Sequence, residues 1–293
     1  MQAHPFEVWN TDEATPAPAD AAAAPCLHLE SGAILFFPVI PVPLAEDDRA
    51  FLLAQRQSRR AYHKNVAYRP AEDRLSGADA ATPADAERLR AILRSFSREA
   101  VAFVSGFLAP YAAHLRADFA SFRPVEEEGR PMRLRARNDL LHVDSFPTRP
   151  TRGGRILRFF VNINPDRPRV WRTGDGFEAL AAAFRDRMPP FRPDGGIAGR
   201  ALAALGLARP AYDRWMLDFH NFLKENAAFQ QDCRKTRWSF PPGSAWMVFT
   251  DAVSHAVLSG RFALEQTFIV DLAGMVAPER APLAVLRRLY GTA

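Results

Sequence analysis

The sequence predicts an α+β fold in which a helical N-terminal third packs on an antiparallel β core, either a barrel or a sandwich. A helix start stands at Thr82-Pro83, with a capping threonine, a proline at the first position and Asp85 in the first turn. From residue 131 the segments become short, aromatic or β-branched, and proline and glycine separate them. No linker or repeat interrupts the 293 residues, so we expect a single domain over 31–293 after a flexible lead-in over 1–30.

The N-terminal part begins with that lead-in because residues 11–25 are rich in Ala, Pro and Asp. Residues 31–130 are expected to be largely helical. The expected elements there are a short buried strand at 33–40, helices at 44–57 and at 82–119 with an interruption near Pro110, and a polar loop at 58–70.

The β core is expected over residues 131–275, with helices inserted between its strands and a closing C-terminal helix within 276–293. The expected strands are MRLRARND, LLHVDSF, RILRFFVNINP, RPRVWRT, TRWSF, AWMVFT, SHAVLS and FALEQTFIVDL, and the expected helices are 176–188, 210–231 and 282–291.

Composition favours a basic protein that attracts anions. Lys+Arg total 38 against 33 for Asp+Glu, the pI is about 9.6, and all but three of the basic residues are arginines. Arginine binds phosphate and carboxylate through its planar fork. Two cysteines are too few for a disulfide framework, and no apolar run of about 20 residues is present. The N-terminal segment has neither a basic region nor a long apolar core, so we expect no signal peptide. We therefore expect a cytoplasmic protein that touches a membrane only at its surface.

The stretch LLHVDSFP, residues 140–147, places a histidine and an aspartate two positions apart in an apolar run. In an extended strand His142 and Asp144 share a face, so they are suited to bind one metal ion together. A second histidine is then needed. His255 stands late in the β region, whereas the other histidines fall in the lead-in, a loop or helical patterns, where we interpret them as structural: His4, His28, His63, His114 and His220.

Two histidines and one carboxylate on a β scaffold form the facial triad of non-haem Fe(II) oxygenases. The order H-x-D followed by a histidine 113 residues later resembles that of the Fe(II)/2-oxoglutarate dioxygenases, which have a double-stranded β-helix, a jelly-roll core of cupin type. The competing interpretation is two buried, hydrogen-bonded polar residues and an unrelated histidine.

2-Oxoglutarate also needs a cation for its distal carboxylate. Arg158 lies on the strand after H-x-D, opposite the apolar face of Leu157, Phe159, Val161 and Ile163, and this polar face is predicted to line a cavity rather than to meet solvent. Arg261, six residues after His255, is the second candidate, and Thr267 adds a hydroxyl. We favour Arg158.

Two longer blocks, RNDLLHVDSFPTRPTRGGRILRFFVNINPDRPRVW and DAVSHAVLSGRFALEQTF, resemble the 3-deoxy-D-manno-oct-2-ulosonic acid (Kdo) hydroxylases from about residue 30 to the C-terminus. The resemblance implies that His142, Asp144 and His255 bind iron. It also implies O2- and 2-oxoglutarate-dependent 3-hydroxylation of Kdo on lipid A precursors, with ascorbate as a stimulant. The partner implied is an anionic glycolipid at the cytoplasmic face of the inner membrane. The residues that we expect to bind it are Arg133, Arg135 and Arg137 on one strand face, Arg152, and Trp171 against a sugar ring.

Three alternatives stay open at this stage. The first is a 2-oxoglutarate oxygenase that acts on another anionic small molecule or on an amino-acid side chain. The second is a basic nucleic-acid-binding protein with structural histidines, although no binding motif is recognisable and we expect no nucleic-acid partner. The third, a metal-free sugar-binding β-sandwich, has no need of His255. Iron-dependent turnover of 2-oxoglutarate separates the oxygenases from the other two classes.

Overall fold

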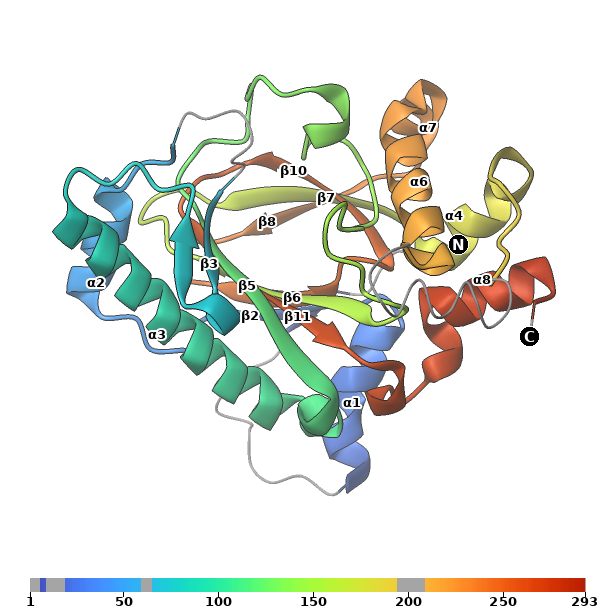
Figure 1. The fold of residues 1–293 in the computed structure, drawn as a ribbon, viewed down its shortest axis with the longest axis horizontal. Coiled ribbons are helices and arrows are strands. Elements are labelled where there is room, and N and C mark those ends of the chain that lie inside the picture. The colour runs from blue at the N-terminus through green and yellow to red at the C-terminus, as the bar shows by residue number, and fades with distance from the viewer. Residues whose placement is uncertain (1–5, 9–18, 59–64, 194–208, 293) are drawn as a thin grey trace.

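Two β-sheets face each other across the middle of the protein (Figure 1). The structure, a computed structural model, describes residues 6–8, 19–58, 65–193 and 209–292. The large sheet has the order β1-β2-β9-β6-β11-β5-β3-β4 and the small sheet the order β10-β7-β8. The β1–β2 pair is parallel and the other pairs are antiparallel. In the described part of the chain the two sheets do not join into a closed barrel.

The strands of the large sheet are β1 (Phe6–Val8), β2 (Ile34–Phe37), β3 (Val66–Arg69), β4 (Arg74–Ser76), β5 (Leu115–Arg123), β6 (Arg155–Asn162), β9 (Ala245–Phe249) and β11 (Ala263–Val270). Those of the small sheet are β7 (Arg169–Gly176), β8 (Thr236–Phe240) and β10 (Val253–Ser259). The helices are α1 (Ala19–Glu30), α2 (Glu46–Ala54), α3 (Pro83–Phe107), α4 (Phe177–Ala183), α6 (Ala211–Glu225), α7 (Ala227–Asp232) and α8 (Pro282–Tyr290). Across the described residues, none of the helices has both the length and the apolar character that crossing a bilayer requires.

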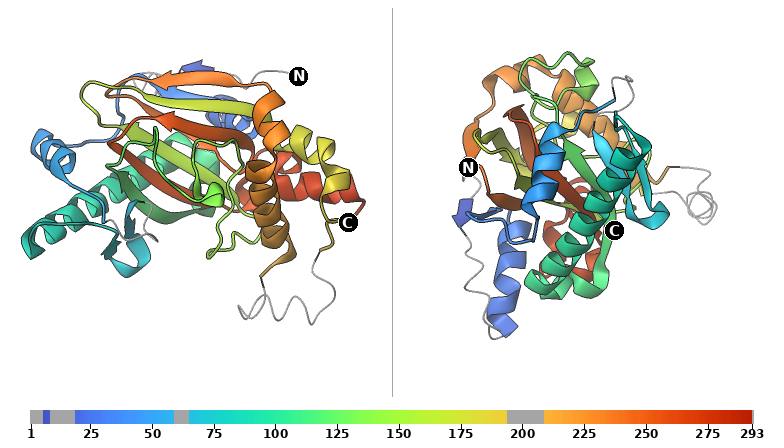
Figure 2. Two further views of the ribbon diagram at one scale, coloured as in Figure 1. Left: turned by 90° about the horizontal axis from the view of Figure 1, so that it is seen from above. Right: turned by 90° about the vertical axis from the view of Figure 1, so that its left-hand side faces the viewer.

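Helices α1 and α3 cover the outer side of the large sheet (Figures 1 and 2). Helix α3 packs Leu93, Phe96 and Val104 into the same core as the apolar face of β6. Helices α4, α6, α7 and α8 gather at one end of the two sheets. The long α3 starts as predicted, since Thr82 Oγ1 accepts a hydrogen bond of 3.1 Å from the Asp85 amide.

Strand β6 separates the apolar core from the interior between the sheets. Leu157, Phe159, Val161 and, just after the strand, Ile163 are buried in the core beneath α3. Arg158 and Phe160 point the other way and line a cavity. The prediction that this polar face encloses a cavity instead of meeting solvent is therefore confirmed.

The helix predicted to reach Phe119 ends at Phe107, which corrects the expectation of a largely helical segment over 31–130. A short 3₁₀ helix, Ala109–His114, follows, and β5 starts at Leu115. Pro110 explains the break, because its ring excludes a backbone hydrogen bond and disfavours a helical conformation in the residue before it. Strand β2 lies within the strand predicted at 33–40, whereas β3, β4 and β5 lie where no strand was predicted.

The expected lead-in is also partly wrong. Residues 19–30 form α1, which starts in a run of alanines, the strongest helix formers; residues 11–18 lie outside the described part of the chain. A third correction concerns MRLRARND, where Leu134–Ala136 form a 3₁₀ turn. Arg133, Arg135 and Arg137 therefore do not share one face of a strand.

Candidate metal centre

A cavity of about 900 Å³ opens between the two sheets and α6. Its lining is strongly basic, because eight cationic side chains face only two carboxylates, Asp144 and Glu265. The cations are Arg69, Arg74, Arg123, Arg135, Arg149, Arg158, Arg169 and Lys224. A cleft with so unequal a charge attracts anionic ligands.

The fold brings the H-x-D segment and His255 together. His142 forms an isolated bridge with His255 in β10: each amide donates to the other residue's carbonyl, at 3.1 and 2.9 Å. The Asp144 amide donates to the Thr250 carbonyl at 2.7 Å. The two imidazole centroids are 4.7 Å apart. Asp144 lies beside both rings, with its Oδ1 3.6 Å from His142 Nε2 and its Oδ2 4.0 Å from His255 Nε2.

Backbone carbonyls fix the orientation of both rings. His142 Nδ1 lies 2.7 Å from the Leu140 carbonyl, and His255 Nδ1 lies 2.9 Å from the Val253 carbonyl. Because a carbonyl only accepts, Nδ1 carries the proton in each ring and Nε2 presents its lone pair toward Asp144. Burial, together with the positive charge of Lys224, holds the pKa of His142 well below its usual range. Burial also lowers the pKa of His255, so both imidazoles are neutral at pH 7.

Asp144 is ionised. Burial alone would raise its pKa, but the positive charge of Arg158 outweighs burial and holds the pKa well below the usual range. Arg158 Nη2 lies 2.8 Å from Asp144 Oδ2. Two neutral imidazoles and a carboxylate in one buried place are the protonation states that a divalent metal requires, and this donor set fits Fe(II).

A third histidine, His220 on α6, lies at the same place. Its Nδ1 is 2.7 Å from the Val143 carbonyl, and its ring meets that of His142 nearly edge-on with centroids 4.9 Å apart. Ligand atoms of His142, Asp144 and His220 all lie within 4.8 Å of one another. From the sequence alone we interpret His220 as structural, because it stands in a helical pattern. The sequence does contain a pattern that could have indicated a role in the site. Leu217, His220, Asn221 and Lys224 follow the i, i+3, i+4, i+7 spacing of one helix face, and all four line the cavity.

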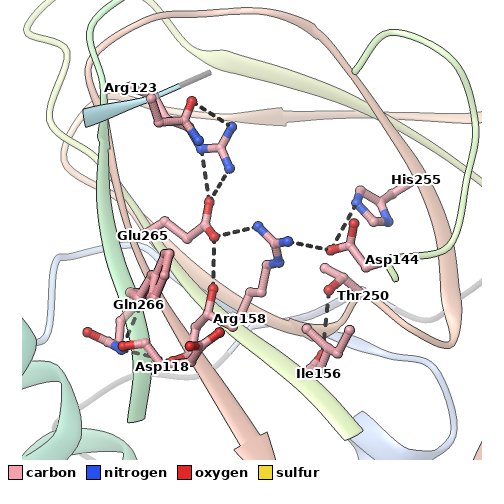
Figure 3. A network of polar contacts seen from close by, with 12 residues as sticks. Asp118, Arg123, Asp144, Ile156, Arg158, Thr250, His255, Glu265 and Gln266 are labelled. Atoms are coloured by element: carbon pink, nitrogen blue, oxygen red, sulfur yellow. Dashed lines mark hydrogen bonds and ion pairs between the residues drawn. The ribbon is translucent and has the colours of Figure 1, made fainter. Parts of the chain in front are cut away.

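Arg158 is the centre of a charged network beside the histidines (Figure 3). Its guanidinium pairs with Asp144 on one side and with Glu265 on the other. Arg123 Nε donates to Glu265 Oε2 at 2.9 Å, and Thr267 Oγ1 donates to Glu265 Oε1 at 3.0 Å. Arg158, Glu265 and Thr267 sit on the paired strands β6 and β11, where Thr267 faces Arg158 in register.

Of the other residues predicted to bind cosubstrate or substrate, some line the cavity and others do not. Arg135 and Trp171 line the cavity, and Trp171 stacks on His255 with a centroid distance of 5.2 Å and an interplanar angle of 22°. Arg261 is exposed, over the ring of Phe262. Three further arginines are also absent from the cavity lining, namely Arg133, Arg137 and Arg152. His4 and His63 lie outside the described residues.

Comparison with known proteins identifies the family. Residues 12–293 match the family of 3-deoxy-D-manno-oct-2-ulosonic acid (Kdo) hydroxylases. The chain belongs to the Kdo hydroxylase family. Crystal structures of the Kdo hydroxylase KdoO, a non-haem Fe(II) α-ketoglutarate-dependent dioxygenase, have the same fold. The KdoO complex with cobalt(II) is 33% identical over 99% of this chain and 97% of KdoO, with a TM-score of 0.85. The complex with α-ketoglutarate and Fe(III) is 32% identical over 98% and 96%, with a TM-score of 0.83. No curated protein matches the chain.

Membership in the Kdo hydroxylase family confirms the predicted fold class, an α+β protein whose jelly-roll core is buttressed by helices. It also confirms the enzyme class expected from the order of H-x-D and the distal histidine.

Lys224 of this hydroxylase is a further cavity residue that was not predicted from the sequence. It is 3% exposed, lines the cavity, and donates to the Arg135 carbonyl at 3.1 Å.

The network around Glu265 predicts acid sensitivity of this Kdo hydroxylase. Burial would raise the pKa of Glu265, but Arg123 and then Arg158 outweigh it and lower the pKa from 4.5 to about 2. Since the folded-state pKa lies below the unfolded value, the stabilisation is present above pH 4.5 and is lost as the pH falls toward 2. Linkage makes the loss about 3 kcal/mol. Urea unfolding at a series of pH values measures it.

The control for this effect is Glu265→Gln, which has no titrating carboxyl group at this position. The variant is expected to be less stable than wild type at pH 6 and to lose less stability on acidification. Equal pH slopes for the two proteins would contradict the role given to Glu265.

Proposed function

We propose that this chain is an Fe(II)- and 2-oxoglutarate-dependent hydroxylase that adds a 3-hydroxyl to Kdo in lipid A precursors. The observation that carries the proposal is the meeting of two neutral imidazoles and an ionised carboxylate in a cavity lined by cations. Family membership supports the same reaction, because KdoO has been crystallised with Fe(III) and either α-ketoglutarate or succinate.

We propose His142, Asp144 and His255 as the iron ligands. Bound iron would supply the activation of dioxygen that C–H hydroxylation needs. The protein keeps this site ready: Arg158 holds Asp144 ionised, and carbonyls orient the two rings. Trp171, stacked on His255, limits the access of water to that ring.

The cosubstrate is expected on the β6–β11 side of the cavity. Arg158 and Thr267 both line the cavity next to Asp144, and we propose that they contact 2-oxoglutarate. Arg261, the second candidate, is exposed, which supports the choice of Arg158. Arg158 already pairs with Asp144 and Glu265, so the distal carboxylate of 2-oxoglutarate is expected to use further donors.

The acceptor is expected to approach over the basic mouth of the cavity. A Kdo–lipid A precursor carries sugar carboxylates and phosphates, which suit the arginines and Lys224 of the lining. We further propose that this basic surface contacts the anionic cytoplasmic leaflet of the inner membrane.

Mass spectrometry of a Kdo–lipid A precursor tests the function. Incubation with the protein, Fe(II), ascorbate and 2-oxoglutarate should add one oxygen to the Kdo fragment, with one succinate formed for each hydroxylation. Ascorbate is varied separately, and we expect it to stimulate turnover. A chelator should stop both products. Succinate without oxygen in Kdo would assign another acceptor, and the absence of iron-dependent succinate formation would reject the dioxygenase.

A further inference from the structure

We propose that Gln230 on α7 is a positioning residue of the metal centre, which fixes the backbone beside His142 by taking the place of a neighbouring strand. One edge of the segment 141–144 faces β10, where His142 forms its bridge with His255. The opposite edge faces α6 and α7, whose side chains supply hydrogen bonds to it. The proposal rests on the proposed assignment of His142 as an iron ligand.

The side-chain amide of Gln230 pairs with both backbone groups of Leu141. The Leu141 amide donates to Gln230 Oε1 at 3.0 Å, and Gln230 Nε2 donates to the Leu141 carbonyl at 2.8 Å. A side-chain amide carries the same kinds of acceptor and donor as a peptide group, so this pair repeats the two-bond exchange between facing residues of an antiparallel sheet. Leu141 is only 1% exposed, and a buried backbone group without a partner is unfavourable.

These two bonds act on His142 through the planar peptide groups on either side of Leu141. The Leu141 N–H belongs to the same peptide group as the Leu140 carbonyl, which orients the His142 ring by accepting from Nδ1 at 2.7 Å. The Leu141 carbonyl belongs to the same peptide group as the His142 N–H, which donates to the His255 carbonyl at 3.1 Å. Each peptide group is therefore held from both sides, by Gln230 on one side and by a histidine of the proposed ligand set on the other.

Gln230 is itself held in place by the junction of the two helices. Its Nε2 also donates to the Leu223 carbonyl at 2.8 Å, one of the last four carbonyls of α6, which have no partner within the helix. Asn226 caps the start of α7, where its Oδ1 accepts from the Phe229 amide at 3.2 Å. Because an N–H only donates and a carbonyl only accepts, these partners also fix which way the Gln230 amide faces.

Helix α6 also holds the chain that follows the H-x-D segment. Asp213 is 3% exposed and accepts hydrogen bonds from the amides of Thr151 and Arg152 at 2.6 and 3.0 Å. This contact fixes the connection to β6, whereas Gln230 bonds to the two peptide groups next to His142. Gln230 is therefore the position at which a change should reach the metal centre most directly.

Gln230→Met tests the proposal, because methionine has a similar length but lacks the amide oxygen and the N–H groups. The matched control is Gln231→Met, at the next position of α7, where the side chain is exposed. Gln230→Glu is a second variant. It keeps an acceptor for the Leu141 amide but, when ionised, has no N–H for the Leu141 carbonyl. Circular dichroism and thermal unfolding check that each variant is folded. If Gln230→Met does not fold, Gln230→Glu decides.

Three measurements follow the effect from the backbone to the metal. Hydrogen exchange of the metal-free protein at the Leu141 amide should be about 10-fold faster in Gln230→Met, as expected for loss of a buried hydrogen bond. The affinity for Co(II), measured by competition with a chelator, should fall about 10-fold in Gln230→Met and in Gln230→Glu. The visible absorption spectrum of bound Co(II) should change in both, because the His142 ring is less firmly oriented. Gln231→Met should match wild type throughout.

The spectrum and the affinity separate positioning from a merely structural role. A folded Gln230→Met, or Gln230→Glu in its place, with the Co(II) affinity and spectrum of wild type would overturn the proposal, even with lower thermal stability. Weaker binding and an altered spectrum, with Gln231→Met unchanged, would support it. A wild-type protein that does not bind Co(II) would reject the proposed ligand set instead, and exchange at the Leu141 amide would then decide whether Gln230 fixes this backbone.

Discussion

Substitution of His255 by alanine is expected to abolish iron-dependent succinate formation and to lower the amount of Fe(II) or Co(II) retained by the protein. His255 supplies one of only two imidazoles in the proposed ligand set, and its Nε2 faces Asp144. Loss of a group that merely supports a metal ligand costs about 10- to 100-fold in affinity or activity, so loss of a ligand should cost more than about 100-fold. The variants His142→Ala and Asp144→Ala should behave alike. Bound metal per protein and succinate formed per minute are the two measurements.

His220→Ala is the matched control for this prediction. His220 is also an imidazole beside Asp144, and its ligand atom lies within 4.8 Å of those of His142 and Asp144. We expect the variant to retain the metal. If His220→Ala loses the metal and His255→Ala keeps it, the third ligand comes from α6 and the proposed triad is wrong.

The second large effect concerns the buried ion pair of Arg155 and Asp251. Their side chains are 0% and 1% exposed, and Arg155 Nε donates to Asp251 Oδ2 at 2.8 Å. Asp251→Ala leaves a guanidinium buried without its counter-ion, which is expected to destabilise the fold by about 3–5 kcal/mol. Asp251 also follows Thr250, whose carbonyl accepts the Asp144 amide. We therefore expect metal affinity to fall together with the free energy of unfolding.

An exposed pair provides the comparison. Arg288 and Glu178 are joined at 2.6 Å, but their side chains are 51% and 63% exposed. Glu178→Ala should change the free energy of unfolding by less than about 1 kcal/mol and leave metal binding unchanged. Urea unfolding measures both variants. Similar effects of the two substitutions would show that the buried pair does not stabilise the turn between β9 and β10.

Several features of the site were predictable from local patterns in the sequence. The alternation in β6 separates Leu157 and Phe159 from Arg158, and this alternation is visible in the sequence because a strand has a side-chain period of two. The H-x-D pair and the distal histidine were found by their order. Their meeting at His142 and His255 depends on pairing between segments 113 residues apart, which the family resemblance implied and spacing alone did not.

Other features depend on tertiary contacts that no local pattern reports. His220 and Lys224 line the cavity because one face of α6 is directed toward it. The sequence does not predict this, because a polar helix face more often meets solvent. The hydrogen bond of Arg169 with the Gly260 carbonyl and its ion pair with Glu127 likewise join segments that are far apart in the sequence. The strand conformation of residues 115–119 was missed because β5 gains its stability from pairing with β11 and β3, which outweighs the helical pattern of its residues.

The most direct test of the central claim is an anomalous difference map from crystals of the protein grown with Co(II), which KdoO also binds. We predict one strong peak coordinated by Nε2 of His142, Nε2 of His255 and a carboxylate oxygen of Asp144. A peak that is coordinated by His220 in place of His255, or that lies away from the H-x-D segment, would contradict the account.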